Sequence, residues 1–330
     1  MPLADGGEGT LEVIQQLHGG TWITVDTFDS LMRPIQADYL YLADQKTAYI
    51  EMARASGLAL LAVKERKPLK TSTFGTGVFI ADALTRGATQ IILTIGGSAT
   101  NDAGIGMAAA LGWKFLDVTG APLDAIGENL IHISSISAPA LAETCIFTVV
   151  TDVTNPLAGP SGAAHVFAAQ KGASAAVIKQ LDKGLNNIAT FFGSIASEEG
   201  AGAAGGLGFG LMTFLGGRLV SGFDMVATQV GLEARIAAAD LIVTGEGRLD
   251  EQSLQGKGPV GVARLARRLG KKIVGVAGSV DDSAALRTQF DLLIPIKPAA
   301  MPLDEAMRRT GELIETAVRA HATALRALSS

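Results

Sequence analysis

A short apolar run, a glycine-containing loop and a segment with helical periodicity follow one another several times along the chain. Five of the apolar runs have the length and composition of buried strands. These runs are 90–95, 146–151, 240–244, 272–277 and 291–296. Strands that alternate with helices are typical of α/β folds, in which ligands gather where parallel strands end. The sequence therefore predicts an α/β protein with binding loops at its strand ends.

The remaining pattern predicts a second, different region. Segments 22–27 and 38–50 alternate apolar with polar residues, which favours antiparallel strands with one solvent-exposed face. Helices are predicted at 78–86, 105–111, 175–192, 259–269 and 304–327, and the glycine-rich stretch 200–217 as a loop followed by a buried helix. A chain of 330 residues exceeds one ordinary core. We therefore expect two domains, with a boundary near residue 220, where the mixed pattern gives way to regular strand–helix alternation.

Composition narrows the classes of partner. The net charge of −5 is spread along the chain without an extended basic run, so nucleic acid and anionic membrane surfaces are poor candidates. The longest uncharged stretch, 200–217, is shorter than the ~20 apolar residues of a membrane helix, and no secretory leader pattern begins the chain. The single cysteine, Cys145, lies in an apolar run and predicts a strand position. We expect a cytoplasmic protein with a small-molecule substrate.

The segment 244–259 carries the richest set of reactive side chains. After a buried strand it supplies Glu246, Arg248, Asp250 and Lys257, and a predicted helix begins at Pro259. The free N–H groups and dipole of a helix N-terminus favour an anion, while carboxylates suit a metal ion or a proton. The segment is not a Walker A loop, because glycine follows the lysine where serine or threonine would be needed. An ordinary surface turn is the alternative interpretation.

A second candidate loop spans 96–106 and leads from a strand into an alanine-rich helix. Its side chains Ser98, Thr100, Asn101 and Asp102 could line a polar pocket. Alternatively, Thr100 or Asn101 only caps the helix and Asp102 only complements its dipole. Both interpretations place this loop at the end of a buried strand.

Four shorter features are ambiguous. Asp5 and Glu8 stand beside glycines and could bind a metal or a hydroxyl group, and Asp152 either caps a turn or serves a site at a strand end. Arg54 either clamps a substrate carboxylate or forms a surface ion pair with Glu51. The segment 202–210 lacks the dinucleotide fingerprint, which leaves close helix packing and adenine-nucleotide contact open.

Taken together, seven blocks resemble the signatures of the bacterial glycerate kinase family (type 1). The blocks are ADGGEGT at 4–10, IEMARASGL at 50–58, STFGTG at 72–77, GGSATNDAG at 96–104, DVTNPL at 152–157, GAAGGLG at 202–208 and TGEGRLDEQSLQGK at 244–257. They occur in one order and span essentially the whole chain, which makes the resemblance specific.

The resemblance implies a two-domain α/β fold. A flavodoxin-like parallel-sheet domain would be formed by residues 1–9 plus 222–330, and an inserted mixed α/β domain by residues 10–221. Family members begin with an additional strand and helix that carry a motif like DSFKG, whereas this sequence starts almost directly at the first block. We therefore expect the flavodoxin-like domain to be incomplete at its N-terminus, with Met1 an internal methionine or the chain a truncated product.

The resemblance also implies ATP-dependent phosphorylation of D-glycerate with Mg²⁺, giving 2-phosphoglycerate by in-line transfer in an interdomain cleft, by a monomer or homodimer. On this hypothesis Asp250 is the base, Arg248 stabilises transferred charge and Lys257 holds phosphate. The metal ligands would be Glu246 with Asp152 or Asp102; the substrate residues would be Arg54, Ser98, Thr100, Asn101, Asp5 and Glu8; and the nucleotide would contact Gly96, Gly97, Gly205, Gly206, Gly256 and Gly258. The alternatives are a kinase for another small hydroxy acid, a 3-phosphoglycerate product, or a catalytically impaired ligand-binding protein.

Overall fold

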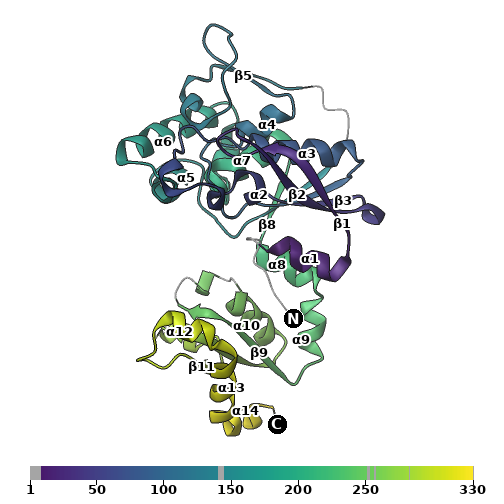
Figure 1. Ribbon diagram of the computed structural model, residues 1–330, viewed down its shortest axis with the longest axis vertical. Helices are drawn as coiled ribbons and strands as arrows, with labels where there is room; N and C mark the ends of the chain where they lie inside the picture. The colour runs from purple at the N-terminus through teal and green to yellow at the C-terminus, as the bar shows by residue number, and fades with distance from the viewer. Residues whose placement is uncertain (1–8, 140–144, 251–252, 256–257, 282, 330) are drawn as a thin grey trace. The chain divides into compact units, whose positions relative to one another are not determined.

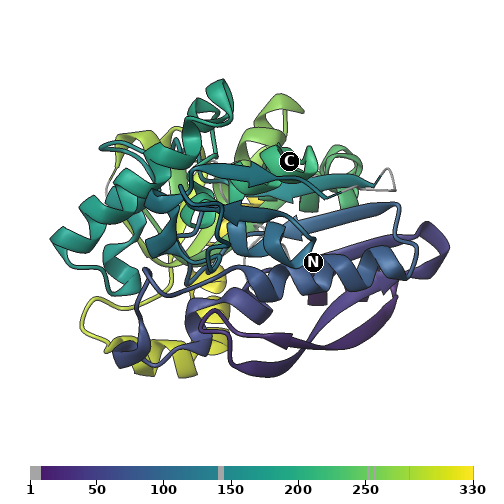
Figure 2. The same ribbon diagram turned by 90° about the horizontal axis from the view of Figure 1, so that it is seen from above.

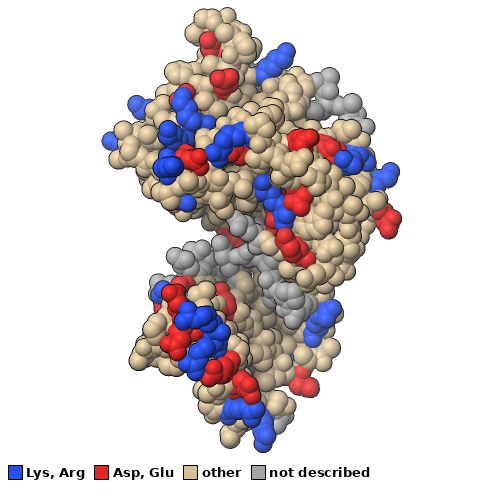
Figure 3. Space-filling view, in the orientation of Figure 1, with Lys and Arg blue, Asp and Glu red and all other residues tan. Residues whose placement is uncertain are grey.

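The computed structural model describes residues 9–139, 145–250, 253–255, 258–281 and 283–329. The described residues form two compact units, called here the 9–222 unit and the 223–330 unit (Figure 1). Both units are mixed α/β structures with parallel strands, as the strand–helix alternation predicts. On the face shown in Figure 3, acidic and basic side chains are interspersed.

A six-stranded sheet organises the 9–222 unit in the order β1-β2-β3-β4-β7-β8. Its strands are β1 (Thr21–Phe28), β2 (Pro34–Leu42), β3 (Thr47–Glu51), β4 (Gln90–Thr94), β7 (Ile146–Val150) and β8 (Arg218–Val220). The first three strands are antiparallel, and β3, β4, β7 and β8 are parallel. The segment predicted as one strand at 38–50 is divided, because a 3₁₀ turn at Ala43–Gln45 separates β2 from β3. A separate antiparallel pair joins β5 (Lys114–Leu116) to β6 (Ser135–Ser137).

Helices of this unit pack on the sheet through an apolar core that includes Tyr39, Phe79, Ile91 and Phe209. The helices are α1 (Thr10–His18), α2 (Ala53–Ser56), α3 (Phe74–Thr85), α4 (Ile105–Ala110), α5 (Ala163–Phe167), α6 (Ala175–Ala189) and α7 (Ala203–Leu215), with 3₁₀ turns at Leu58–Leu60, Val63–Glu65, Gly127–His132, Ala169–Lys171 and Gly193–Ser197. Helix α3 contacts β1 and β3, and Figure 2 shows it lying along the strands. The predicted loop and buried helix at 200–217 correspond to α7 and the turn before it.

Three parallel strands form the sheet of the 223–330 unit in the order β11-β10-β9. They are β9 (Leu241–Leu249), β10 (Lys272–Val280) and β11 (Leu292–Pro295). Two helices precede the strands, α8 (Gly222–Gln229) and α9 (Leu232–Ala237). Between and after the strands lie the turn Ser253–Gln255, α10 (Gly258–Arg268), α11 (Ala284–Arg287), α12 (Leu303–Arg308), α13 (Thr310–Ala320) and α14 (Ala322–Leu328). Each predicted strand of this region is present, and β9 and β10 run further than their apolar runs.

Two helix predictions of this unit have different outcomes. Helix α10 begins at Gly258 and is followed by Gly270 with a φ of +68°, so the predicted start and stop are found to within one residue. The single helix predicted at 304–327 is wrong: it is broken at Arg309 and His321, whose ψ angles of 16° and 12° do not continue a helix. The apolar periodicity runs through both breaks, which is why the sequence pattern conceals them. In the described part of the chain, every helix is too short or too polar to cross a bilayer.

Candidate functional site

Glu246, Asp250 and Ser253 meet at the carboxyl end of strand β9. The Ser253 hydroxyl donates to Glu246 Oε1 at 2.7 Å, and the Ser253 backbone N–H donates to Asp250 Oδ1 at 3.3 Å. The Asp250 N–H in turn donates to Ser253 Oγ at 3.2 Å. One serine therefore links the two carboxylates that the sequence selects as metal ligand and base.

Arg248 lies beside this pair and bridges to the neighbouring strand. Its Nη2 atom donates to both oxygens of Asp281, at 3.0 and 3.2 Å, and its Nε atom lies 3.4 Å from Asp250 Oδ2. The hydrogen bond to Asp281 raises the pKa of the Arg248 guanidinium above its ordinary value. Asp281 directly follows β10. The sequence pattern does not identify it, because only the strand register that pairs Arg248 with Ser279 brings Asp281 next to Arg248.

The N-terminus of α10 is also close to this cluster. A methyl group placed on Gly258 would lie 4.0 Å from Glu246 Oε2. Helix α10 has eleven residues, so its first turn presents N–H groups and a positive dipole end near the carboxylate. Lys257 and Gly256, predicted to hold phosphate, lie outside the described residues, as do Asp5 and Glu8.

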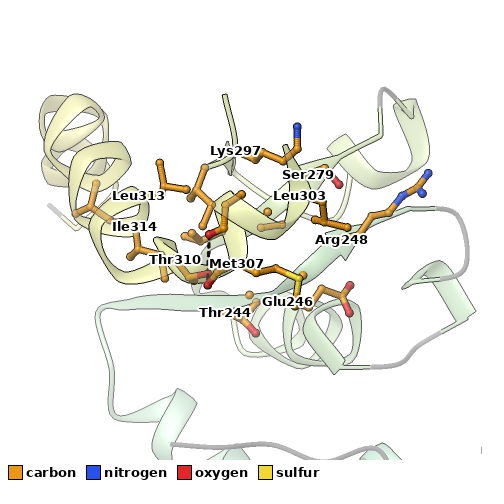
Figure 4. Close-up of a pocket in the computed structure, with 18 of the residues that line it drawn as sticks. Thr244, Glu246, Arg248, Ser279, Lys297, Leu303, Met307, Thr310, Leu313 and Ile314 are labelled. Atoms are coloured by element: carbon orange, nitrogen blue, oxygen red, sulfur yellow. Dashed lines mark hydrogen bonds between the residues drawn. The ribbon is translucent and has the colours of Figure 1, made fainter. Parts of the chain in front are cut away.

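A cavity of about 900 Å³ opens next to these strand ends (Figure 4). Its lining joins Thr244, Glu246 and Arg248 of β9 to an apolar wall from α12 and α13 that includes Met307 and Ile314. In Figure 4, the guanidinium of Arg248 points away from this apolar wall. The cavity and the carboxylate cluster therefore meet at Glu246 and Arg248 but differ in chemical character.

The second predicted loop, after β4, is mostly buried. Ser98 is 8% exposed, and Thr100, Asn101 and Asp102 are fully buried. Lys171, which the sequence did not single out, reaches this loop from the end of the turn Ala169–Lys171. Its Nζ atom donates to Ser98 Oγ at 2.7 Å and to the Thr100 carbonyl at 2.6 Å. Burial lowers the pKa of Lys171 to about 7, and nearby Asp102 opposes this shift.

Asp102 organises the loop from inside. Its Oδ2 atom accepts hydrogen bonds from the Thr73 N–H and hydroxyl, both at 2.8 Å, and from Gly106 N–H at 3.2 Å, while Oδ1 accepts from Gly104 N–H at 3.3 Å. Burial raises the pKa of Asp102, and the four hydrogen bonds oppose that effect. Both oxygens are thus engaged at the start of α4, which favours the helix-terminus interpretation over metal ligation.

Gly205 and Gly206 pack against the same loop. They have φ angles of +70° and +92°, and a methyl group on Gly205 would lie 2.0 Å from the Thr100 carbonyl oxygen. Ala103 N–H also donates to the Gly205 carbonyl at 3.1 Å. Of the two interpretations left open for this segment, the geometry favours close backbone packing.

Asp152 and Arg54 are held by structural partners. Asp152 Oδ1 accepts from the Ser221 hydroxyl at 3.0 Å and from Gly222 N–H at 2.9 Å, so it joins the end of β7 to the start of α8. The Arg54 guanidinium binds three carboxylates: Glu51 at 2.9 Å, Asp38 at 2.8 Å and Glu12. It also lies 4.7 Å from the centre of the Trp22 ring. The ion-pair interpretation of Arg54 therefore fits this structure better than a substrate clamp.

Parallel strands that end in carboxylates and an arginine, next to a helix N-terminus, are features of α/β proteins that bind small anionic ligands. Comparison with known proteins identifies the family within this class. The model of the glycerate kinase family matches residues 1–326. The chain therefore belongs to the glycerate kinase family, a family of enzymes, and the family predicted from the seven sequence blocks is confirmed.

Individual relatives cover most of the chain. Glycerate kinase from Bacillus subtilis (strain 168) is 42% identical over an alignment of 329 residues that covers 97% of this chain and 86% of the relative. Glycerate 2-kinase from Escherichia coli (strain K12) is 42% identical over 322 residues, covering 93% of this chain and 84% of the relative. A crystal structure assigned provisionally as glycerate kinase 2 from Salmonella typhimurium LT2 superimposes with a TM-score of 0.83 at 39% identity, covering 99% of this chain and 88% of that one.

Proposed function

We propose that this enzyme transfers the γ-phosphoryl group of ATP to a hydroxyl group of D-glycerate and releases 2-phosphoglycerate. The observation that carries the proposal is the family match over nearly the whole chain. The regiochemistry is supported by the Escherichia coli relative, which is named a glycerate 2-kinase.

The strand-end cluster supplies the groups that phosphoryl transfer requires. Asp250 would accept the proton of the attacking hydroxyl, since a carboxylate positioned beside a nucleophile acts as a general base. Arg248, whose side chain is 62% exposed, would contact the charge on the transferred group. Lys257 and the N-terminus of α10 would orient phosphate oxygens. The hydrogen bonds of Ser253 to Glu246 and Asp250 would hold these carboxylates in place.

Mg²⁺, which the family implies, can be tested against the donor set of the cluster. In the described part of the chain, no three acidic, histidine or cysteine side chains gather as a metal site. Mg²⁺, however, usually takes only one or two protein carboxylates, with water and substrate phosphates as further ligands. Glu246, linked to Asp250 through Ser253, fits that requirement. When bound, the ion would neutralise phosphate charge; Asp102, with both oxygens occupied, is a poorer candidate.

The buried loop after β4 would supply the groups that recognise glycerate. The Asn101 side chain and the Thr100 hydroxyl are buried and have no hydrogen-bond partner among the residues the structure describes. Buried polar groups are normally paired, because an unmade hydrogen bond costs about 1–3 kcal/mol. A hydroxy acid offers both donors and acceptors, which supports a role for these two residues in substrate binding.

A coupled assay with ATP, Mg²⁺ and D-glycerate tests the proposal, with the product identified by phosphorus NMR. We expect turnover that depends on D-glycerate and a product whose phosphate is on the 2-oxygen. Turnover of another hydroxy acid in preference to D-glycerate would reject the substrate, and a 3-phosphate would reject the regiochemistry.

A further inference from the structure

Lys171 is a fully buried lysine whose side chain has two specific hydrogen bonds. Lysine is rarely buried unless its amine is paired, and here Nζ donates to Ser98 Oγ and to the Thr100 carbonyl. Both the ammonium and the neutral amine carry at least two N–H groups. These two hydrogen bonds are therefore available in either protonation state.

The bond from Lys171 determines what Ser98 can do. Because the serine oxygen accepts from Lys171, the hydroxyl hydrogen remains to donate to another group. Ser98 keeps 8% of its surface exposed, whereas the exposed fraction of Lys171 and Thr100 is 2% or less. The serine hydroxyl is thus a donor at the edge of the buried loop.

Two further donors stand next to Ser98. Gly96 and Gly97 are exposed, and Gly97 has a φ of +74°, a conformation that favours glycine. Their backbone N–H groups have no acceptor among the residues that the structure describes. Successive N–H groups in such a turn form a concave site for an anion.

We propose that Gly96, Gly97 and Ser98 form a subsite for an oxyanion and that Lys171 is its positioning residue, because it fixes the Ser98 hydroxyl as a donor. The oxyanion is either the carboxylate of the hydroxy acid or a phosphate of the nucleotide, and both present the same acceptor oxygens. The inference rests on the proposed function for the identity of these two ligands. It assigns Lys171 a role that goes beyond linking two loops.

Calorimetric titration with D-glycerate and, separately, with ADP tests this role without requiring turnover. The variants are Lys171→Met, Ser98→Ala and the double variant, with Lys179→Met as the matched control, because Lys179 is an exposed lysine on α6. We expect the Kd of one ligand to rise roughly tenfold or more in both single variants, since a hydrogen bond to a charged group is lost. The double variant should add little, because both changes remove the same donor. The ligand whose Kd rises identifies the source of the oxyanion.

Ser98→Ala keeps the inference testable if Lys171→Met does not fold, because it preserves the lysine bond to Thr100. Where turnover is measurable, KM for the same ligand should rise more than kcat falls. Unchanged Kd values for both ligands in Ser98→Ala would overturn the subsite, as would a wild-type protein that binds neither ligand. A wild-type protein that binds both but transfers no phosphate would reject the proposed function and leave the subsite supported or overturned by its Kd values.

Discussion

The loop after β4 and the segment at the end of β9 differ in environment. Each lies at the carboxyl end of a parallel strand, and each combines glycines with carboxylates. In the 9–222 unit, Asp102 is fully buried and accepts four hydrogen bonds from its own unit. In the 223–330 unit, Arg248 is 62% exposed and its neighbour Asp250 is 24% exposed. Hydrogen bonds to the buried Asp102 carboxylate therefore stabilise the loop after β4, whereas the segment at the end of β9 exposes charged side chains to solvent.

The largest expected effect is a loss of turnover without a loss of stability, at the exposed segment that contains Asp250. Asp250→Asn removes the proposed base but keeps an oxygen that can accept from Ser253. We expect kcat to fall by roughly 10²–10⁴, the usual contribution of a general base, with the unfolding midpoint nearly unchanged. Asp304→Asn, at an exposed position of α12, is the control. A kcat within a few-fold of wild type would show that another group accepts the proton.

The converse effect is expected at the buried loop. In Asp102→Asn an amide NH₂ replaces an oxygen among N–H donors, so hydrogen bonds are lost where water cannot replace them. We expect about 3 kcal/mol of destabilisation, measured by urea unfolding. Glu246→Gln should change stability by less than about 1 kcal/mol. Equal stability losses in the two variants would remove the distinction between the loops.

A smaller effect tests why the buried loop keeps its shape. Gly205→Ala places a methyl group 2.0 Å from the Thr100 carbonyl at a positive φ, so the backbone contact must shift. Gly216→Ala has a similar φ of +65° but nothing within 4 Å. We expect Gly216→Ala to cost about 1 kcal/mol and Gly205→Ala about 1–2 kcal/mol more, measured by thermal unfolding. Equal costs would mean that the φ angle alone requires glycine.

The sequence predicts the positions of strands better than it predicts which charged side chains are buried. The strands at 90–95, 146–151 and 272–277 are found because buried parallel strands are continuous apolar runs. The carboxyl ends of the runs 90–95 and 240–244 locate the two loops after β4 and β9. The roles of Arg54 and Asp102 could not be separated from their alternatives, because the sequence does not reveal which partners surround a charge.

Contacts between distant segments explain the remaining omissions. Asp281 becomes relevant only when β10 pairs with β9, and Lys171 only when its turn packs under Ser98, 73 residues away in sequence. Neither residue belongs to a local pattern with a chemical meaning. The domain limits predicted at 1–9 plus 222–330 and 10–221 stay a prediction.

A last expected effect is a pH dependence confined to the buried loop. Burial lowers the folded-state pKa of Lys171 from 10.5 to about 7, and Asp102 is the charged group that opposes this shift. Between these two pKa values the unfolded chain binds more protons than the folded one, so stability rises with pH. Below pH 7 both states hold the proton and the dependence vanishes.

The unfolding free energy of wild type minus that of Lys171→Met isolates the contribution of the Lys171 amine. We expect the unfolding free energy of wild type, relative to the variant, to increase from pH 7 toward pH 10 with a slope of at most ~1.4 kcal/mol per pH unit. Lys179→Met, at an exposed position of α6, is the matched control. A flat difference for Lys171→Met would mean that the amine keeps its proton in the folded protein. The buried loop would then hold a charged lysine with no measurable cost to the stability of the folded protein.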